Sequence, residues 1–89
     1  MEAKELQKVI KENLKYTIRG FVWNTKRPNV GNTKKCGFID SEGYRKICLL
    51  RKIYREDLLV WVLFTGRYPD KLIHRDKNKI NNRIGNLKE

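Results

Sequence analysis

The sequence has few of the side chains from which metal centres and nucleophilic catalysts are built. His74 is the only histidine among the 89 residues, and Cys36 and Cys48 are the only cysteines. The two cysteines lie twelve residues apart, without a second cysteine pair or histidines at ligand spacing, so a closed zinc site lacks an adequate ligand set. We therefore predict that both cysteines are buried, reduced thiols.

Long apolar runs are also missing from the sequence. The apolar segments are too short to span a bilayer, and the charged start of the chain is followed by no signal-peptide core. We therefore expect no membrane partner and an intracellular, reducing compartment such as a host cytoplasm. A single domain over residues 1–89 is expected, and it is too small for a large enclosed cofactor pocket, so function should lie on the surface.

Acidic residues are scarce relative to basic ones. Lys and Arg number 21 against 10 Asp and Glu, which gives a net charge of +11. Residues 19–55 hold ten basic and two acidic side chains, and residues 66–89 hold seven and three. A field of this sign attracts phosphate backbones, so nucleic acid, and DNA first, is the expected partner. A solvated basic surface without a ligand, or an acidic protein surface as partner, stays open.

The N-terminal half alternates between helix-forming and strand-forming patterns. Apolar residues at helical spacing predict an amphipathic helix over residues 2–15. Residues 16–23 are rich in Thr, Ile, Phe, Val and Trp and predict a strand. Residues 24–35 contain Pro, Gly and paired basic residues, so they predict a loop, which is a candidate DNA-contacting arm.

The middle of the chain predicts a strand hairpin and then a buried helix. Strands are expected over residues 36–39 and 44–50, joined by a turn in which Gly43 can take a positive φ, and a short strand over 52–55 follows. An apolar block after Glu56 and Asp57 predicts a central helix, because acids stabilise a helix N-terminus, with Gly66 as its stop. Ten apolar residues are expected to form much of the core: Leu6, Val9, Ile10, Phe21, Val22, Ile47, Leu49, Leu59, Val62 and Leu63.

The run from Leu72 to Leu87 contains the residues that could carry chemistry. It places His74 twelve residues before the pair Asn86-Leu87. A neutral histidine can take a proton from water, and an asparagine carbonyl can hold its ring in orientation. Taken alone, the pattern favours an ordinary strand-end histidine followed by asparagines that form turns and caps.

Motifs along nearly the whole chain extend this observation. In order they are Phe21-Val22-Trp23, Gly43-Tyr44, Tyr54 with Leu59-Val60-Trp61, Gly66-Arg67-Tyr68-Pro69, His74-Arg75-Asp76, Asn82-Arg83 and Asn86-Leu87-Lys88. From Leu6 onward the ordered set resembles the small phage and prophage HNH endonucleases. The resemblance implies a compact α+β domain, with an N-terminal helix, a small mostly antiparallel sheet, a central buried helix and a C-terminal β-hairpin remnant of the ββα-metal motif.

The same resemblance implies His74 as the catalytic base and Asn86 as its orienting group, with Mg²⁺ or Mn²⁺ as the metal if the protein is active. Several positions depart from the family pattern. Ile73 stands where the family has an acidic metal ligand, Asp57 where it has a histidine, and Lys77 where it has a glycine. The chain ends at Glu89, before the helix that carries a second ligand in the family.

These departures predict an HNH fold that has lost cleavage, with a vestigial His74 and Asn86 and no cofactor. Asp76 is the one nearby carboxylate that could bind a metal, although its position favours the role of turn former. Ten basic residues are expected to hold a nucleic-acid backbone: Lys34, Lys35, Arg45, Lys46, Arg51, Lys52, Arg75, Lys77, Lys79 and Arg83. Trp23 and Tyr44 are interpreted as core residues that could otherwise stack on bases.

Two further functions stay open at this point. One is an active endonuclease, completed if necessary by a partner that supplies the missing ligands. The other is a phage or mobile-element inhibitor that places its basic surface on a host nuclease or DNA-defence protein. The sequence does not distinguish a monomer from an oligomer.

Overall fold

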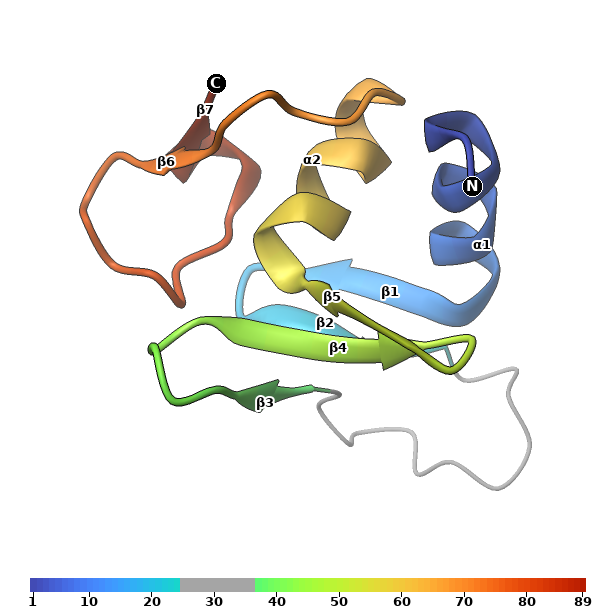
Figure 1. The fold of residues 1–89 in the computed structure, drawn as a ribbon, viewed down its shortest axis with the longest axis horizontal. Helices are drawn as coiled ribbons and strands as arrows, with labels where there is room; N and C mark the ends of the chain where they lie inside the picture. The colour runs from blue at the N-terminus through green and yellow to red at the C-terminus, as the bar shows by residue number, and fades with distance from the viewer. Residues whose placement is uncertain (25–36) are drawn as a thin grey trace.

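Two helices stand side by side above two of three small antiparallel sheets, and the third sheet lies beside the helices, in the computed structural model, which describes residues 1–24 and 37–89 (Figure 1). Helix α1 spans Ala3–Asn13 and α2 spans Glu56–Thr65. The strands are β1 (Leu14–Thr17), β2 (Gly20–Trp23), β3 (Phe38–Ile39), β4 (Arg45–Leu49), β5 (Lys52–Arg55), β6 (Ile73–His74) and β7 (Leu87–Lys88), and a short 3₁₀ helix, η1, spans Ile84–Asn86. The α+β class is confirmed.

The strands form three separate sheets within the described residues, whereas one small sheet and a C-terminal hairpin were expected. Strand β1 pairs with β2, β4 lies between β3 and β5, and β6 pairs with β7, all antiparallel. The expected continuous strand over residues 16–23 is wrong. Ile18 and Arg19 form a turn, and Gly20 follows it at a φ of 111°, a conformation that favours glycine and lets the chain reverse.

Helix α2 occupies the centre of the fold, between α1 and the β6–β7 hairpin (Figure 1). It begins directly after β5 and ends where Gly66 takes a φ of 70°. The Gly66 N–H donates to the Val62 carbonyl at 2.8 Å, which is the left-handed cap expected from the sequence. Helix α1 packs on α2, and the Gln7 side chain donates to the Leu63 carbonyl at 2.8 Å.

The core lies between the helices and the strands. Seven of the predicted core residues are buried, namely Leu6, Ile10, Phe21, Ile47, Leu49, Leu59 and Val62. Val9 and Leu63 pack against this cluster while partly buried, and Val22 is also only partly buried. Leu87 was not expected in the core, and it is buried because the β6–β7 hairpin folds back toward α2.

The prediction of a buried Cys48 is wrong. Side chains alternate across a strand, and in β4 Arg45, Ile47 and Leu49 face inward, so Cys48 is exposed. Cys36 and all but the first residue of the candidate DNA-contacting arm over residues 24–35 lie outside the described residues. Of the helices that the structure describes, neither is long and apolar enough to cross a bilayer.

Candidate functional site

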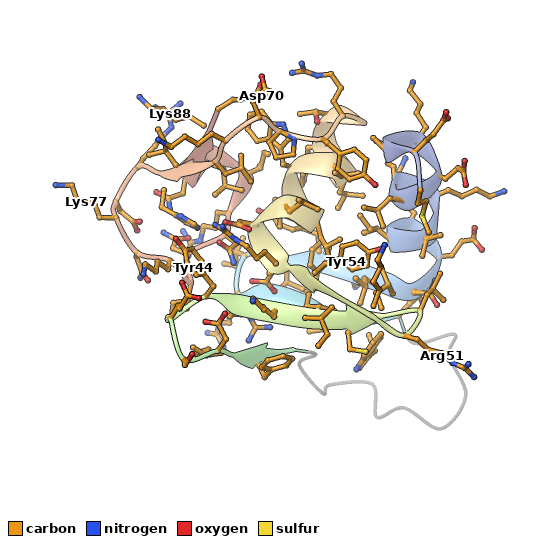
Figure 2. The ribbon with its side chains drawn as sticks, viewed as in Figure 1. Tyr44, Arg51, Tyr54, Asp70, Lys77 and Lys88 are labelled. Atoms are coloured by element: carbon orange, nitrogen blue, oxygen red, sulfur yellow. The ribbon has the colours of Figure 1, made fainter. Side chains whose placement is uncertain are left out.

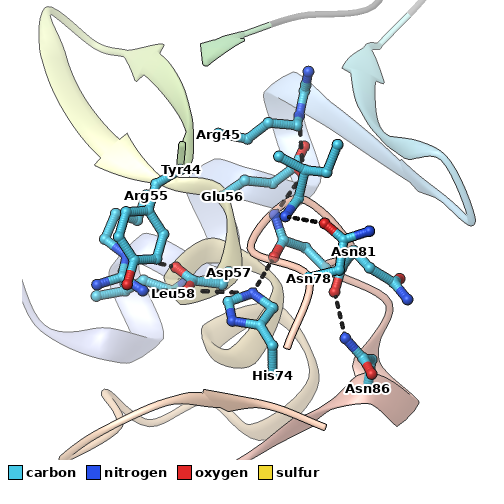
Figure 3. Close-up of polar contacts among 12 residues, drawn as sticks. Tyr44, Arg45, Arg55, Glu56, Asp57, Leu58, His74, Asn78, Asn81 and Asn86 are labelled. Carbon is cyan, nitrogen blue, oxygen red and sulfur yellow. Dashed lines mark hydrogen bonds and ion pairs between the residues drawn. The ribbon is translucent and has the colours of Figure 1, made fainter. Parts of the chain in front are cut away.

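Two buried carboxylates open helix α2. Glu56 and Asp57 are 0% and 2% exposed, and each is paired with an arginine from the preceding strands. Arg45 Nε donates to Glu56 Oε1 at 3.1 Å, and Arg55 Nε donates to Asp57 Oδ1 at 3.1 Å (Figure 3). The backbone N–H of Phe21 also donates to Glu56 Oε2 at 3.0 Å. Both charges are therefore compensated, as buried carboxylates require.

His74 belongs to the same buried network. Its Nε2 lies 2.7 Å from Asn82 Oδ1 and 3.8 Å from Asp57 Oδ2. The Asn82 Nδ2 donates to Glu56 Oε1 at 2.8 Å, so the amide must present its oxygen to the imidazole. The His74 Nε2 therefore carries a hydrogen, and in the neutral ring Nδ1 is left as the acceptor.

The structure corrects the expected partner of His74. Asn82 contacts the ring, whereas Asn86 bonds to the Asp76 loop. The hairpin register explains the difference, because His74 pairs with Leu87 and both side chains are buried. Asn86 lies in η1, before β7 begins, and its side chain exchanges hydrogen bonds with Asp76 in the loop.

The Asp76 carboxylate accepts hydrogen bonds from three residues of the hairpin loop and so fixes its shape. Its Oδ1 accepts the Asn78 backbone N–H at 2.8 Å and the Asn86 Nδ2 at 2.9 Å, while its Oδ2 accepts the Asn81 Nδ2 at 2.7 Å. Hydrogen bonds from the Asn81 side chain, the Asn78 backbone and the Asn86 side chain, in that order, lower the pKa of the Asp76 carboxyl below its usual value. These contacts are those of a turn former.

The oxygen donors around His74 do not form a fitting set for a hard divalent cation. Ile73 is 41% exposed and has an alkyl side chain without donor atoms. The Asp76 oxygens accept amide hydrogens, and the carboxylates of Glu56 and Asp57 are buried against arginines. Within residues 1–24 and 37–89, no group of three or more His, Cys, Asp or Glu side chains could hold a metal ion. Mg²⁺ needs several oxygen ligands in near-octahedral geometry, and these residues do not supply them.

Some of the predicted nucleic-acid-binding residues are buried or paired within the chain, and others are exposed. The assignment of Arg45 is wrong, because Arg45 is 8% exposed and its guanidinium pairs with Glu56. Lys46 pairs with Asp40 at 3.0 Å, and Arg83 Nε donates to the Ile18 carbonyl at 3.2 Å. The side chains of Arg51, Lys52, Arg75 and Lys77 are exposed, and Arg51 and Lys77 project from opposite ends of the molecule (Figure 2). Lys34 and Lys35 lie outside the described residues.

Tyr44 connects the β3–β4 turn to the hairpin loop. The Arg55 guanidinium lies over the Tyr44 ring at 3.9 Å from its centroid, and Lys79 Nζ lies at 4.7 Å. Lys79 Nζ also donates to the Glu42 carbonyl at 2.9 Å. Trp23 packs partly buried against the core, which agrees with its interpretation as a core residue. Tyr44 does not belong to the core cluster, and its ring instead contacts Arg55 and Lys79.

Sequence reasoning did not identify Arg55, Glu56, Asp57 and Asn82 as members of one site. The acids were recognised as favourable at a helix N-terminus, but an exposed pair would have served that purpose equally well. The spacing of eight residues between His74 and Asn82 contains no regular element and so gave no local signal. Only the folded hairpin brings Asn82 between His74 and Glu56.

Comparison with known proteins gives one match. Residues 57–89 match the family model described as HNH endonuclease. This segment runs from the first turn of α2 to the end of the chain and includes His74, Asn82 and Asn86. No curated protein and no solved structure matches the chain. The C-terminal segment is therefore similar to HNH endonucleases, a class that acts on nucleic acid.

Proposed function

We propose that this protein is an HNH-related nucleic-acid-binding module that holds phosphate backbones and does not cleave them in a metal-dependent reaction. The observation that carries the proposal is the engagement of the carboxylates around His74. Arginines pair with Glu56 and Asp57, and amide groups occupy the oxygens of Asp76. A divalent cation would have to displace these partners before it could stabilise a leaving oxygen.

The surface charge supports the binding half of the proposal. Arg51, Lys52, Arg75 and Lys77 are exposed, and the whole chain carries a net charge of +11. Contacts of this type are made to phosphate and sugar, so they position a backbone without reading its sequence. The expected binding is salt-sensitive and weakly sequence-specific, because it releases condensed counterions.

The test combines binding and cleavage on the same protein sample. A labelled duplex and a labelled single strand are titrated with the full chain at about 50 and about 200 mM salt, and supercoiled plasmid is incubated with Mg²⁺ or Mn²⁺. Six or more phosphate contacts predict a loss of affinity of roughly 10³-fold between these salt concentrations. Binding without nicking is the expected result.

A second candidate, a metal-dependent endonuclease completed by ligands from elsewhere, is favoured by one observation. The Asn82 amide fixes the His74 tautomer and leaves Nδ1 as an acceptor, which is the state that a general base needs. Nicking that requires metal and disappears in His74→Ala would establish this candidate and reject the first. Absence of both binding and nicking would reject both and favour an acidic protein surface as the partner.

A further inference from the structure

Three described residues other than glycine adopt a positive φ, and two of them are basic. Leu50, Arg51 and Lys77 have φ values of 50°, 64° and 64°. Side chains with a Cβ disfavour this left-handed conformation, and it persists only where the surrounding structure enforces it. Lys77 also stands at the position where the HNH resemblance places a glycine. This chain therefore carries a cation at a position whose backbone favours glycine.

The loop that carries Lys77 is closed by its own side chains. The Asp76 backbone N–H donates to Asn86 Oδ1 at 3.1 Å, and the Asn86 Nδ2 donates back to Asp76 Oδ1 at 2.9 Å. The Lys77 N–H donates to the His74 carbonyl at 3.0 Å, which completes a tight turn. The loop is thus held in shape by amide groups, so its conformation needs no bound cation.

Basic side chains alternate along this closed loop. Arg75, Lys77 and Lys79 occur at every second residue, and Asp76 is the one acidic residue between them. The Asp76 carboxylate accepts hydrogen bonds from Asn78, Asn81 and Asn86, so its lone pairs are used inside the loop. Lys77 projects outward from the loop (Figure 2). Arg75 and Lys77 are therefore exposed on a loop whose one carboxylate is engaged by amides of the loop, whereas the Lys79 ammonium contacts the Glu42 carbonyl and the Tyr44 ring.

We propose that residues 75–79 form a preorganised phosphate-binding tip, with Lys77 as its leading contact and the phosphodiester backbone of a nucleic acid as its ligand. The lysine and arginine side chains of this tip attract the negatively charged phosphate groups. Binding therefore does not require a divalent metal. This inference rests on the proposed function and deepens it, because it names the surface that makes the contact.

The test uses Lys77→Gly and Arg51→Gly in the full chain, with a labelled duplex, EDTA and a series of salt concentrations followed by fluorescence anisotropy. Each substitution removes one charge and one strained backbone position, so the two variants are matched. Both should melt at a higher temperature, by roughly 4 °C. Lys77→Gly should lose affinity roughly fivefold, and the slope of log K against log salt should fall in magnitude by about one. Arg51→Gly removes an exposed cation that the proposed function also counts among the backbone contacts. It should lose affinity by no more than about twofold, because Arg51 lies at the opposite end of the molecule and contributes only diffuse attraction.

Lys77→Met provides an independent variant that keeps the left-handed strain while removing the charge. It should lose affinity as Lys77→Gly does, without the rise in melting temperature. Equal losses in the Lys77 and Arg51 variants would overturn the inference in favour of diffuse attraction, and unchanged affinity in both Lys77 variants would also overturn it. In those outcomes the proposed function stands. If the wild type binds no duplex or single strand at low salt, the proposed function falls as well.

Discussion

At the scale of single residues, Asn82 decides the environment of His74. Asn82 is 5% exposed. Its side-chain nitrogen donates a hydrogen bond to Glu56, and its side-chain oxygen lies within hydrogen-bond distance of the His74 imidazole. Each of its two hydrogen bonds fixes the orientation that the other requires. A single buried asparagine thus determines which ring nitrogen of His74 carries the hydrogen.

Asn82→Ala should therefore lower the free energy of unfolding by about 2 kcal/mol, because it leaves buried polar atoms of His74 and Glu56 with a missing partner. Urea unfolding followed by tryptophan fluorescence measures the change. Asn78→Ala is the matched control, because Asn78 is exposed and its side chain accepts only a local bond from the Ile80 N–H. An equal loss of stability in the two variants would show that the Asn82 bridge contributes little to folding.

At the scale of elements, α2 is the helix around which the other parts are arranged. Its N-terminus carries the two arginine-paired carboxylates, and its C-terminus is closed by Gly66. A Cβ at Gly66 would have ordinary or slightly close contact with the Gln7 side chain, so the conformation, and not the space, demands glycine there. Gly85 in η1 has open space around its Cα and no positive φ.

Gly66→Ala should consequently cost about 1 kcal/mol of stability, through the left-handed cap, whereas Gly85→Ala should be close to neutral. Thermal melts followed by circular dichroism compare the two directly. For a domain of this size the expected difference in melting temperature is roughly 4–8 °C. Comparable melting temperatures would mean that the end of α2 rearranges without cost.

At the scale of the whole molecule, a polar chain of contacts joins the three sheets. Glu56 of α2 accepts from Phe21 of β2, Arg45 of β4 and Asn82. Asn82 and Asp57 in turn lie against His74 of β6, and Lys79 ties the hairpin loop to the β3–β4 turn. The three sheets share no strand, so this network and the core around α2 hold them together. Both carboxylates in this network, Glu56 and Asp57, are paired with arginines, so we expect the fold of the described residues to need no cation.

The melting temperature should therefore change by less than about 1 °C between excess EDTA and millimolar Mg²⁺ or Mn²⁺, because a ligand stabilises a fold only if it binds the native state. Sodium chloride at matched ionic strength controls for screening of the positive charge. A melting temperature that rises steadily with metal concentration, beyond the salt control, would reveal a cation site and contradict the interpretation of Asp76 as a turn former.

The sequence by itself determined those features whose signals are local. The apolar block after Glu56, with Gly66 behind it, identified α2, and the turn at Gly43 and the strand over 52–55 were also found. The net charge and the HNH-like run around His74 likewise needed no coordinates. Helical periodicity, left-handed glycines and composition are properties of neighbouring residues, so they can be recognised in the chain alone.

Only the tertiary structure decided which side chains share the site. It buried Arg45 against Glu56, exposed Cys48, divided residues 16–23 into a hairpin, and placed Asn82 at His74 while Asn86 closed the Asp76 loop. These outcomes depend on strand register and on side-chain contacts between residues 8 to 11 positions apart in the sequence. A shift of one residue in register would exchange the buried and exposed faces, and no local pattern specifies that choice.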